Sequence, residues 1–301
     1  MDGRRIIWIL GSSRSGSTWL LSMLSKLDGV VPMDDPHLGH HLGVWRPIPL
    51  AWADDEANPE LRTLDEIKRR QPDYFFSDRY RDVWAPALKA LIVARFEAQL
   101  EAGPSYPGSE GILVVKEPGS QAAELLLSLF PDSRVIFLLR DGRDVVDSWL
   151  DGYSDGSWAL EEGAFPIRDD GRLAFVRWQS SVWRYRTAAV RAAFERHPAA
   201  QRVLVRYERL LEDPARELRQ VCARFGLRTG GDQLPRIGNA NSFERLPPTA
   251  RGNGRQARSA QPGSWRYNLT LEEQEAMLAI IGPMLAELGY LENATGLRRA
   301  R

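Results

Sequence analysis

Short apolar runs alternate with longer segments of helical periodicity along this chain of 301 residues. Four runs have the length and the Ile, Val and Leu content of buried strands, at residues 6–10, 111–116, 133–139 and 202–206. Helical spacing of apolar residues follows the first run and recurs near 61–70, 83–102, before Pro131, from about Gly142, and at 172–196, 213–226 and 271–288. Strands that alternate with helices predict an α/β fold, with a central parallel sheet flanked by helices.

Three polar segments interrupt this alternation. Residues 30–58 are dense in Pro, His, Gly and Trp without a clean period, so we expect an ordered loop region there. Residues 151–171 and 229–263 are also expected to be loops. Nothing divides the chain into independent halves, so the sequence favours one domain, 1–301, that carries a helical and loop insert over about 30–110.

Composition sets limits on partners and location. The chain is 43% hydrophobic, with a net charge of zero and a pI near 6.9, which gives no general electrostatic case for binding nucleic acid or a membrane surface. Cys222 is the only cysteine, which excludes an intrachain disulfide and fits a reducing compartment. The N-terminus lacks the apolar core of a signal peptide, and no apolar run approaches the roughly 20 residues of a transmembrane helix. We therefore expect a cytoplasmic protein without a membrane span.

The first strand runs into a loop of small residues before the helical pattern starts. A strand, a small-residue loop and a helix N-terminus form an anion site, because unpaired backbone N–H groups and the positive end of the helix dipole converge there. Gly11 and Gly16 have the spacing of the phosphate loop G-x-x-x-x-G-K-[ST]. The alternative is a turn between strand and helix that binds nothing.

Two departures separate this loop from one that binds a magnesium nucleoside triphosphate. Ser17 stands where that motif has the Lys that reaches the β- and γ-phosphates, and the cation is instead Arg14, within the loop. The third strand is followed by Arg140 rather than by an Asp that would support the metal. Both changes point to an anionic nucleotide that is neutralised by arginines.

A second anion site is predicted at residues 140–148. Arg140 follows the third strand, and Ser148 comes about two helical turns later, so that a forked guanidinium and a hydroxyl can bracket one phosphate. The alternative is a surface cluster of ion pairs between Arg143 and Asp144 or Asp147.

Together these sites resemble those of the sulfotransferases that use 3′-phosphoadenosine 5′-phosphosulfate (PAPS). Residues 13–19, SRSGSTW, resemble the family's 5′-phosphosulfate loop P-[KR]-S-G-[ST]-T-[WL], with Ser13 in place of Pro. Residues 140–148, RDGRDVVDS, resemble its 3′-phosphate motif R-[DN]-P-[RK]-D-V-x-x-S, with Gly142 in place of Pro. Residues 205–214 are similar to the YEDL…DP segment. Arg258 and Trp265 resemble part of R-K-G-x-x-G-D-W, although the Lys-Gly pair is absent.

The resemblance implies a P-loop-like three-layer sandwich, an insert that covers the active site, and a reaction without a metal. It assigns Arg14 to the transferring sulfonate and its bridging oxygen, and places Trp19 or Tyr207 near the adenine. The residues it implies for binding PAPS, or its product PAP, are Arg14, Ser15, Gly16, Ser17, Thr18, Trp19, Arg140, Ser148, Tyr207 and Arg258. Lys116, which ends the second predicted strand, would add positive charge beside Arg14.

The acceptor hydroxyl must lose a proton, so a general base is expected within hydrogen-bond reach. Asp35 ranks first, because it lies 21 residues after Arg14, at about the spacing at which tyrosylprotein-type relatives place a catalytic Glu. Glu117 ranks second, because it lies close to where cytosolic relatives have a catalytic His. His41 or His40 ranks third, because both share the loop of Asp35 and imidazole has the most suitable unperturbed pKa.

The sequence therefore predicts a sulfotransferase that moves a sulfonate group in line, without a metal, from PAPS to a hydroxyl of a small-molecule or glycan acceptor. The alternatives are a P-loop kinase or nucleotide hydrolase, and a non-catalytic nucleotide-binding module. The acceptor pocket is expected from the insert and from the loop at 151–171. Four tryptophans in these segments fit such a pocket and fit equally a core under long loops: Trp45, Trp52, Trp84 and Trp158. Acceptor identity and oligomeric state stay open.

Overall fold

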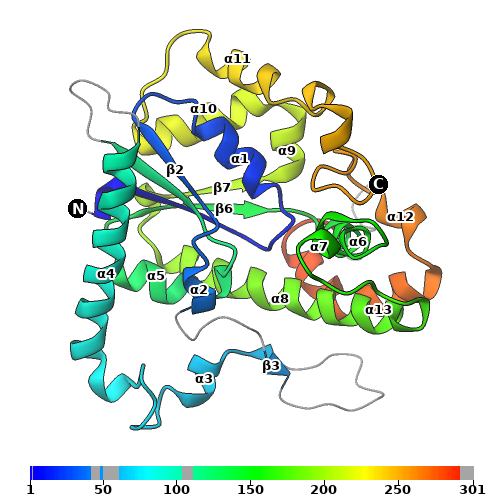
Figure 1. The fold of residues 1–301 in the computed structure, drawn as a ribbon, viewed down its shortest axis with the longest axis horizontal. Coiled ribbons are helices and arrows are strands. Elements are labelled where there is room, and N and C mark those ends of the chain that lie inside the picture. The colour runs from blue at the N-terminus through cyan, green and yellow to red at the C-terminus, as the bar shows by residue number, and fades with distance from the viewer. Residues whose placement is uncertain (2, 42–47, 50–60, 104–110, 292–301) are drawn as a thin grey trace, which may run out of the picture. The chain divides into compact units, whose positions relative to one another are not determined.

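The computed structural model describes residues 1–301 except 2, 42–47, 50–60, 104–110 and 292–301 (Figure 1). The chain divides into two compact units. The first unit comprises Met1–Ile48, Arg62–Leu139 and Arg186–Arg245, and the second comprises Pro49–Leu61, Arg140–Tyr185 and Leu246–Arg301.

A five-stranded parallel sheet forms the centre of the first unit, which confirms the predicted sheet. Its strands are β1 (Ile6–Leu10), β2 (Val30–Asp34), β5 (Ile112–Lys116), β6 (Arg134–Leu139) and β7 (Arg202–Arg206). Their spatial order is β2-β5-β1-β6-β7, and the register pairs Ile9 of the central strand with Lys116 on one side and Ile136 on the other. The strands that follow β1 in the chain lie on both sides of it, β5 and β2 on one side and β6 and β7 on the other. Open α/β sheets bind ligands at the carboxyl end of a strand in this position.

Helices flank the sheet and make up most of the second unit. The helices of the first unit are α1 (Ser17–Leu24), α2 (Leu38–His41), α3 (Leu64–Lys68), α4 (Arg81–Ala102), α5 (Ala123–Leu129), α9 (Tyr207–Glu212), α10 (Pro214–Phe225) and α11 (Gln233–Ala240). Those of the second unit are α6 (Gly142–Gly152), α7 (Trp158–Glu161), α12 (Trp265–Asn268) and α13 (Leu271–Glu287), and α8 (Arg172–Arg196) has residues in both. The 3-10 helices are η1 (Gly3–Arg5), η2 (Asp78–Tyr80), η3 (Ser120–Ala122), η4 (Asp169–Gly171), η5 (Ala199–Gln201), η6 (Phe243–Arg245) and η7 (Pro248–Ala250). A separate pair of short strands is β3 (Ile48–Pro49) with β4 (Leu61–Arg62). Every helix of the described chain is too short or too polar to cross a bilayer.

The side chains of β1 alternate between two helical layers, because successive residues of a strand point to opposite faces. Ile7 and Ile9 are buried in one apolar cluster with residues of α1, α10 and α11, which cover one face of the sheet (Figure 1). Trp8 packs on the other face against Phe96 of α4 and Phe130 at the end of α5, with ring centroids 5.8 and 5.9 Å away. The central strand is therefore buried on both faces.

Strand β2 corrects the expectation that residues 30–58 are all loop. Its sequence, VVPMD, contains Pro32, which lacks the backbone N–H that a ladder needs and so argues against a strand. In the structure β2 is the edge strand and pairs with β5, so the missing donor leaves no second neighbouring strand unsatisfied. The expected loop at 229–263 likewise contains a helix, α11, which buries Leu234 and Ile237.

Helix α10 begins and ends as its sequence predicts. Asp213 accepts a hydrogen bond from the N–H of Arg216 at 3.0 Å, and Pro214 occupies the first turn. Gly226 ends the helix in the left-handed conformation, with φ 65°. The apolar face of α10 buries Cys222, and burial raises the pKa of this thiol to about 11, as expected for a core cysteine.

Gly11 lies where a neighbouring strand comes very close. A methyl group on Gly11 would be 2.2 Å from the carbonyl oxygen of Leu138 in β6. Because backbone must move to make room, we expect Gly11→Ala to lower the free energy of unfolding by about 3 kcal/mol, measured by urea denaturation. Gly3→Ala is the control, since its methyl group would meet atoms only at 3.6 Å or beyond, and it should cost less than about 1 kcal/mol. Equal stability of the two variants would contradict the prediction.

Candidate active site

The loop between β1 and α1 turns sharply at two residues. Arg14 and Gly16 have left-handed backbone, with φ 71° and 88°. This region is uncommon for a residue with a side chain. The turn leads directly into the first residues of α1, whose N–H groups have no partners within the helix. Backbone donors and the positive end of the helix dipole therefore meet at this loop.

The hydroxyl of Ser15 indicates whether the loop can accommodate a phosphate. Its side chain is 1% exposed, and its Oγ has no hydrogen-bond partner among the described residues. A buried hydroxyl without a partner costs about 1–3 kcal/mol, so such a group is rare unless a ligand satisfies it. The residues of the loop fit an anionic oxygen at this position.

Side chains from outside the loop hold it in place. Arg186 donates from Nη1 to the Oγ of Ser13 and from Nε to Oε1 of Gln121, both at 3.2 Å. Ser120 donates to the carbonyl oxygen of Gly11 at 2.6 Å. Ser13 stands where the related motif has Pro, and here its hydroxyl connects the loop to α8.

Two aromatic residues form one wall of the loop. The ring of Tyr207, at the start of α9, lies so close to Gly16 that a methyl group there would be 2.6 Å from Cδ2. Trp19 meets Tyr207 edge to face, with ring centroids 6.2 Å apart, and donates its indole N–H to the carbonyl oxygen of Asn241 at 2.7 Å. Gly16 is thus required both by its backbone angle and by the ring beside it.

The ammonium group of Lys116 joins the first turn of α1 to the end of β2. Its Nζ donates to Oγ1 of Thr18 at 2.7 Å, and it pairs with Oδ1 of Asp34 at 2.6 Å and Oδ2 of Asp35 at 2.9 Å. The three donors of the ammonium group match these three acceptors. Lys116 is nearly buried, whereas the side chain of Asp35 is 40% exposed.

The chain after β2 has an unusual backbone. Asp35 and His37 both have positive φ, at 46° and 54°. The rings of His37 and His40 are stacked, and their Nδ1 atoms are 3.1 Å apart. The backbone of His41 ends α2, but its side chain lies outside the described residues.

Glu117 is adjacent to Lys116 but is engaged elsewhere. Its side chain is buried and accepts backbone N–H bonds from Leu38 at 2.8 Å, Gly39 at 3.4 Å and Gly119 at 2.6 Å. Burial raises the pKa of this carboxyl to about 7, the three hydrogen bonds oppose the rise, and the charge of Asp35 adds to it. Glu117 therefore anchors the first turn of α2.

In the second unit, α6 presents three carboxylates on one face, Asp144, Asp147 and Asp151, at helical spacing. Each of them binds the segment 254–268. Asp144 accepts the N–H of Gly263 at 2.9 and 3.0 Å, and Asp151 accepts the N–H of Gly254 at 3.0 Å.

Asp147 contacts two side chains of the same segment. It forms an ion pair with Arg258 and accepts from Nδ2 of Asn268 at 3.1 Å. The predicted alternative, a surface cluster of Arg143 with Asp144 or Asp147, is wrong, because Asp144 and Asp147 are buried against the segment 254–268. Arg143 instead pairs with Asp141 at 2.6 Å.

Arg140 and Ser148 lie near the carboxylates of this face of α6. Burial raises the pKa of Asp144, while the N–H of Gly263 and the charge of Arg140 oppose the rise. Ser148 is buried and lies one turn after Asp144 on the same face of α6. Two arginines, Arg140 and Arg258, therefore accompany the carboxylates of this face.

A sequence model of the sulfotransferase family matches residues 7–230. The chain belongs to the sulfotransferase family. No curated protein matches it by sequence. The matched range includes the loop at 11–16, Lys116, and Arg140 to Ser148.

Solved sulfotransferases have the fold of this family member. The structure of mouse sulfotransferase SULT7A1 complexed with PAP is 13% identical and aligns over 96% of this chain and 89% of that chain, with a TM-score of 0.55. The sulfotransferase domain from the Synechococcus PCC 7002 olefin synthase is 20% identical over 96% and 95% of the two chains, with a TM-score of 0.51. Sulfotransferase STF9 from Mycobacterium avium is 19% identical over 94% and 76%, with a TM-score of 0.50. These likenesses confirm the α/β architecture.

Two of the four tryptophans considered for the acceptor pocket lie outside the described residues, Trp45 and Trp52. Trp84 is 9% exposed and donates to the carbonyl oxygen of Ser77 at 2.9 Å, and it therefore packs within the insert. Trp158, in the second unit, lies 6.2 Å from the ring of Trp149.

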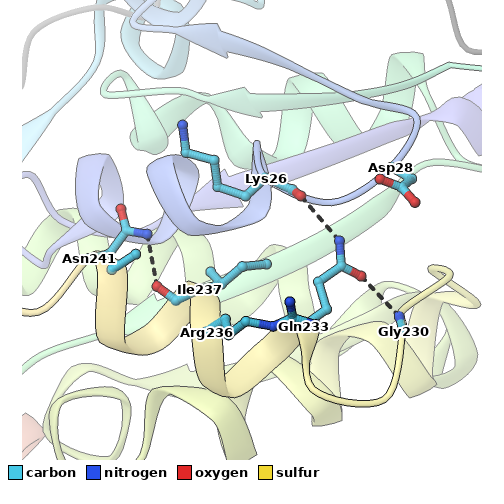
Figure 2. Close-up of a pocket in the computed structure, with 8 residues that line it drawn as sticks. Lys26, Asp28, Gly230, Gln233, Arg236, Ile237 and Asn241 are labelled. Carbon is cyan, nitrogen blue, oxygen red and sulfur yellow. Dashed lines mark hydrogen bonds between the residues drawn. The ribbon is translucent and has the colours of Figure 1, made fainter.

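A pocket of about 560 Å³ lies beyond the C-terminal end of α1 (Figure 2). The loop at 11–16 precedes the N-terminal end of this helix. Gln233 of α11 lines this pocket. Its side chain accepts from the N–H of Gly230 at 3.0 Å and donates to the carbonyl oxygen of Lys26 at 3.4 Å. Asn241 accepts from Ser22 of α1 at 2.9 Å. These contacts hold α11 to α1, and the residues that line the pocket include none from the loop at 11–16.

Several partners of the site carry no signal in the sequence pattern. Arg186 lies in the middle of a long helix, and Ser120 and Gln121 follow a predicted strand without any motif. Asp34 had one indication, its position beside Asp35. The contacts of these residues with the loop and with Lys116 depend on tertiary structure.

The buried carboxyl of Glu117 makes stability depend on pH. Because its pKa is raised from 4.5 to about 7, the folded protein binds more protons than the unfolded chain between these values. The free energy of unfolding should therefore fall, by roughly 3 kcal/mol from this group, as pH rises through that range. In Glu117→Gln this contribution is absent. The stability of the wild type relative to Glu117→Gln should decrease with pH when urea denaturation is repeated from about pH 5 to about pH 8.

The control for this experiment is Glu124→Gln, which changes an exposed glutamate of α5. Its stability relative to the wild type should not vary over the same pH range. A constant difference for Glu117→Gln as well would contradict the raised pKa.

Proposed function

We propose that this protein is a PAPS-dependent sulfotransferase that acts on a hydroxyl of a small-molecule or glycan acceptor. The observation that carries the proposal is the loop before α1, where Arg14 and the buried hydroxyl of Ser15, which has no partner among the described residues, adjoin the helix N-terminus. Family membership supports sulfonate transfer, and PAP is present in the related mouse structure. The lone Cys222 supports a reducing, cytoplasmic location.

Each anion site takes one end of the nucleotide in this proposal. Residues 14–18, from the loop and the first turn of α1, take the 5′-phosphosulfate through backbone N–H groups, hydroxyls and the guanidinium. Arg140, Ser148 and Arg258 take the 3′-phosphate. Guanidinium groups suit both roles because their fork of donors matches planar sets of anionic oxygens.

The transfer itself exchanges one sulfur–oxygen bond for another. The acceptor oxygen bonds to sulfur while the bond from sulfur to the bridging oxygen breaks, and Asp35 takes the hydroxyl proton. Arg14 stabilises the electron pair left on the bridging oxygen, which departs with PAP. Lys116 adds positive charge beside the loop and holds Asp35 in place.

Asp35 is a better candidate for the base than Glu117. The side chain of Asp35 is 40% exposed, and its buried Oδ1 has no hydrogen-bond partner among the described residues, so this oxygen is available to take a proton. The oxygens of Glu117 are buried and receive three backbone N–H bonds, which supports a role in positioning α2. His40 and His41 remain the third choice. The insert at 30–110 and the loop at 151–171 are proposed to form the acceptor pocket.

Calorimetric titration with PAP tests the proposal. The wild type should bind PAP, and the double variant Arg140→Ala/Ser148→Ala should bind it at least about 10-fold more weakly, because charge-assisted hydrogen bonds to the 3′-phosphate are lost. Absence of binding to the wild type, or unchanged binding to the double variant, would overturn the assignment.

The alternatives make different predictions in the same assays. A P-loop kinase or nucleotide hydrolase should turn over ATP with Mg²⁺. A non-catalytic binding module should keep its PAP affinity in Arg14→Ala and should transfer no sulfonate to any member of an acceptor panel.

A further inference from the structure

Asp147 makes a different kind of contact from the other two carboxylates on this face of α6. Asp144 and Asp151 accept backbone N–H groups of the segment 254–268, and such contacts fix the path of the chain. Asp147 instead accepts from a guanidinium, which is a group that can bind an anionic ligand.

This ion pair is buried. The side chain of Asp147 is 2% exposed and that of Arg258 is 9% exposed. Burial alone lowers the pKa of Arg258, but the hydrogen bond and charge of Asp147, with the charges of Asp151 and Asp144, raise it above its ordinary value. The guanidinium is therefore kept charged in a place where an unpaired arginine would be costly.

The geometry also sets where the guanidinium lies. Its Nη2 bonds Oδ2 of Asp147, and its Nη1 donates at 3.3 Å to the carbonyl oxygen of Asp147, which belongs to the peptide group that joins Asp147 to Ser148. Asn268 binds the same carboxylate at 3.1 Å, so Asp147 is held from a second side. Within the described part of the chain, these bonds use two of the five N–H donors of Arg258, which leaves others for an anion.

We propose that Asp147 is a positioning residue that holds Arg258 beside Ser148, so that the guanidinium recognises the 3′-phosphate of the nucleotide. The inference rests on the proposed function. Asp147 stands at a position that the related motif leaves unspecified. In this proposal, selectivity for the 3′-phosphate depends on a carboxylate that does not itself touch the ligand.

Affinities for PAP and for 5′-AMP, which lacks the 3′-phosphate, test the inference by calorimetry. In the wild type PAP should bind more tightly. Asp147→Ala should weaken PAP binding at least about 10-fold and leave 5′-AMP within about twofold, because only the 3′-phosphate loses its partner. Arg258→Ala should have the same effect. The double variant Asp147→Ala/Arg258→Ala should lose no more than Arg258→Ala does, because Asp147 acts through Arg258.

Asp151→Ala is the matched control, since it removes a carboxylate from the same face of α6 but one that binds the backbone of Gly254. It should keep the ratio of PAP to 5′-AMP affinity. Thermal unfolding of each variant checks that it is folded. If Asp147→Ala does not fold, Asp147→Asn replaces it, with an expected loss of about 5-fold for PAP alone.

The outcomes separate this inference from the proposed function. A wild type without preference for PAP overturns both. If the Asp147 variants keep the wild-type ratio of PAP to 5′-AMP affinity, the positioning role alone is overturned. The same holds if Asp151→Ala also lowers this ratio. Tighter PAP binding by Asp147→Ala also overturns it, because Asp147 would then compete with the phosphate for Arg258.

Discussion

The burial of β1 on both faces, with a neighbouring backbone pressed against its end, is the constraint on which the first unit depends. A strand in this position can contribute only its carboxyl end to chemistry, because every side chain before it belongs to the core. The carbonyl oxygen of Leu138 leaves no room for a side chain at Gly11. The chain must therefore turn through small residues, and a turn of small residues exposes backbone N–H groups, which is what an anion needs.

Charge in this protein is arranged by pairing cations with carboxylates inside each unit. In the first unit Lys116 lies between Thr18 and two aspartates, and in the second Arg258 lies on Asp147. A long cationic side chain that is already held loses less conformational freedom when it meets a ligand. The carboxylates also offset the charge of the cations within a buried environment.

Much of the fold was predictable, because hydrophobic periodicity and helix-capping residues are local signals. The strand at 202–206 and the helices at 172–196 and 213–226 have nearly their predicted bounds. The edge strand β2 was not predictable, because Pro32 argues against a strand unless its place at the sheet edge is known. The two candidate anion sites were visible as motifs. The partners of their residues, such as Arg186 and Asp34, were not, because those contacts join segments distant in sequence.

The sequence by itself determined the alternation of strands and helices, the small-residue loop with its arginine, and the helix that begins after Arg140, because each depends on neighbours within a few residues. Tertiary structure gave the candidate groups different environments. It buried Glu117 beside three backbone donors, left the side chain of Asp35 partly exposed and paired with Lys116, and turned three aspartates of α6 toward one distant segment. Burial and partner choice depend on what the rest of the chain brings to each position, which no local pattern records.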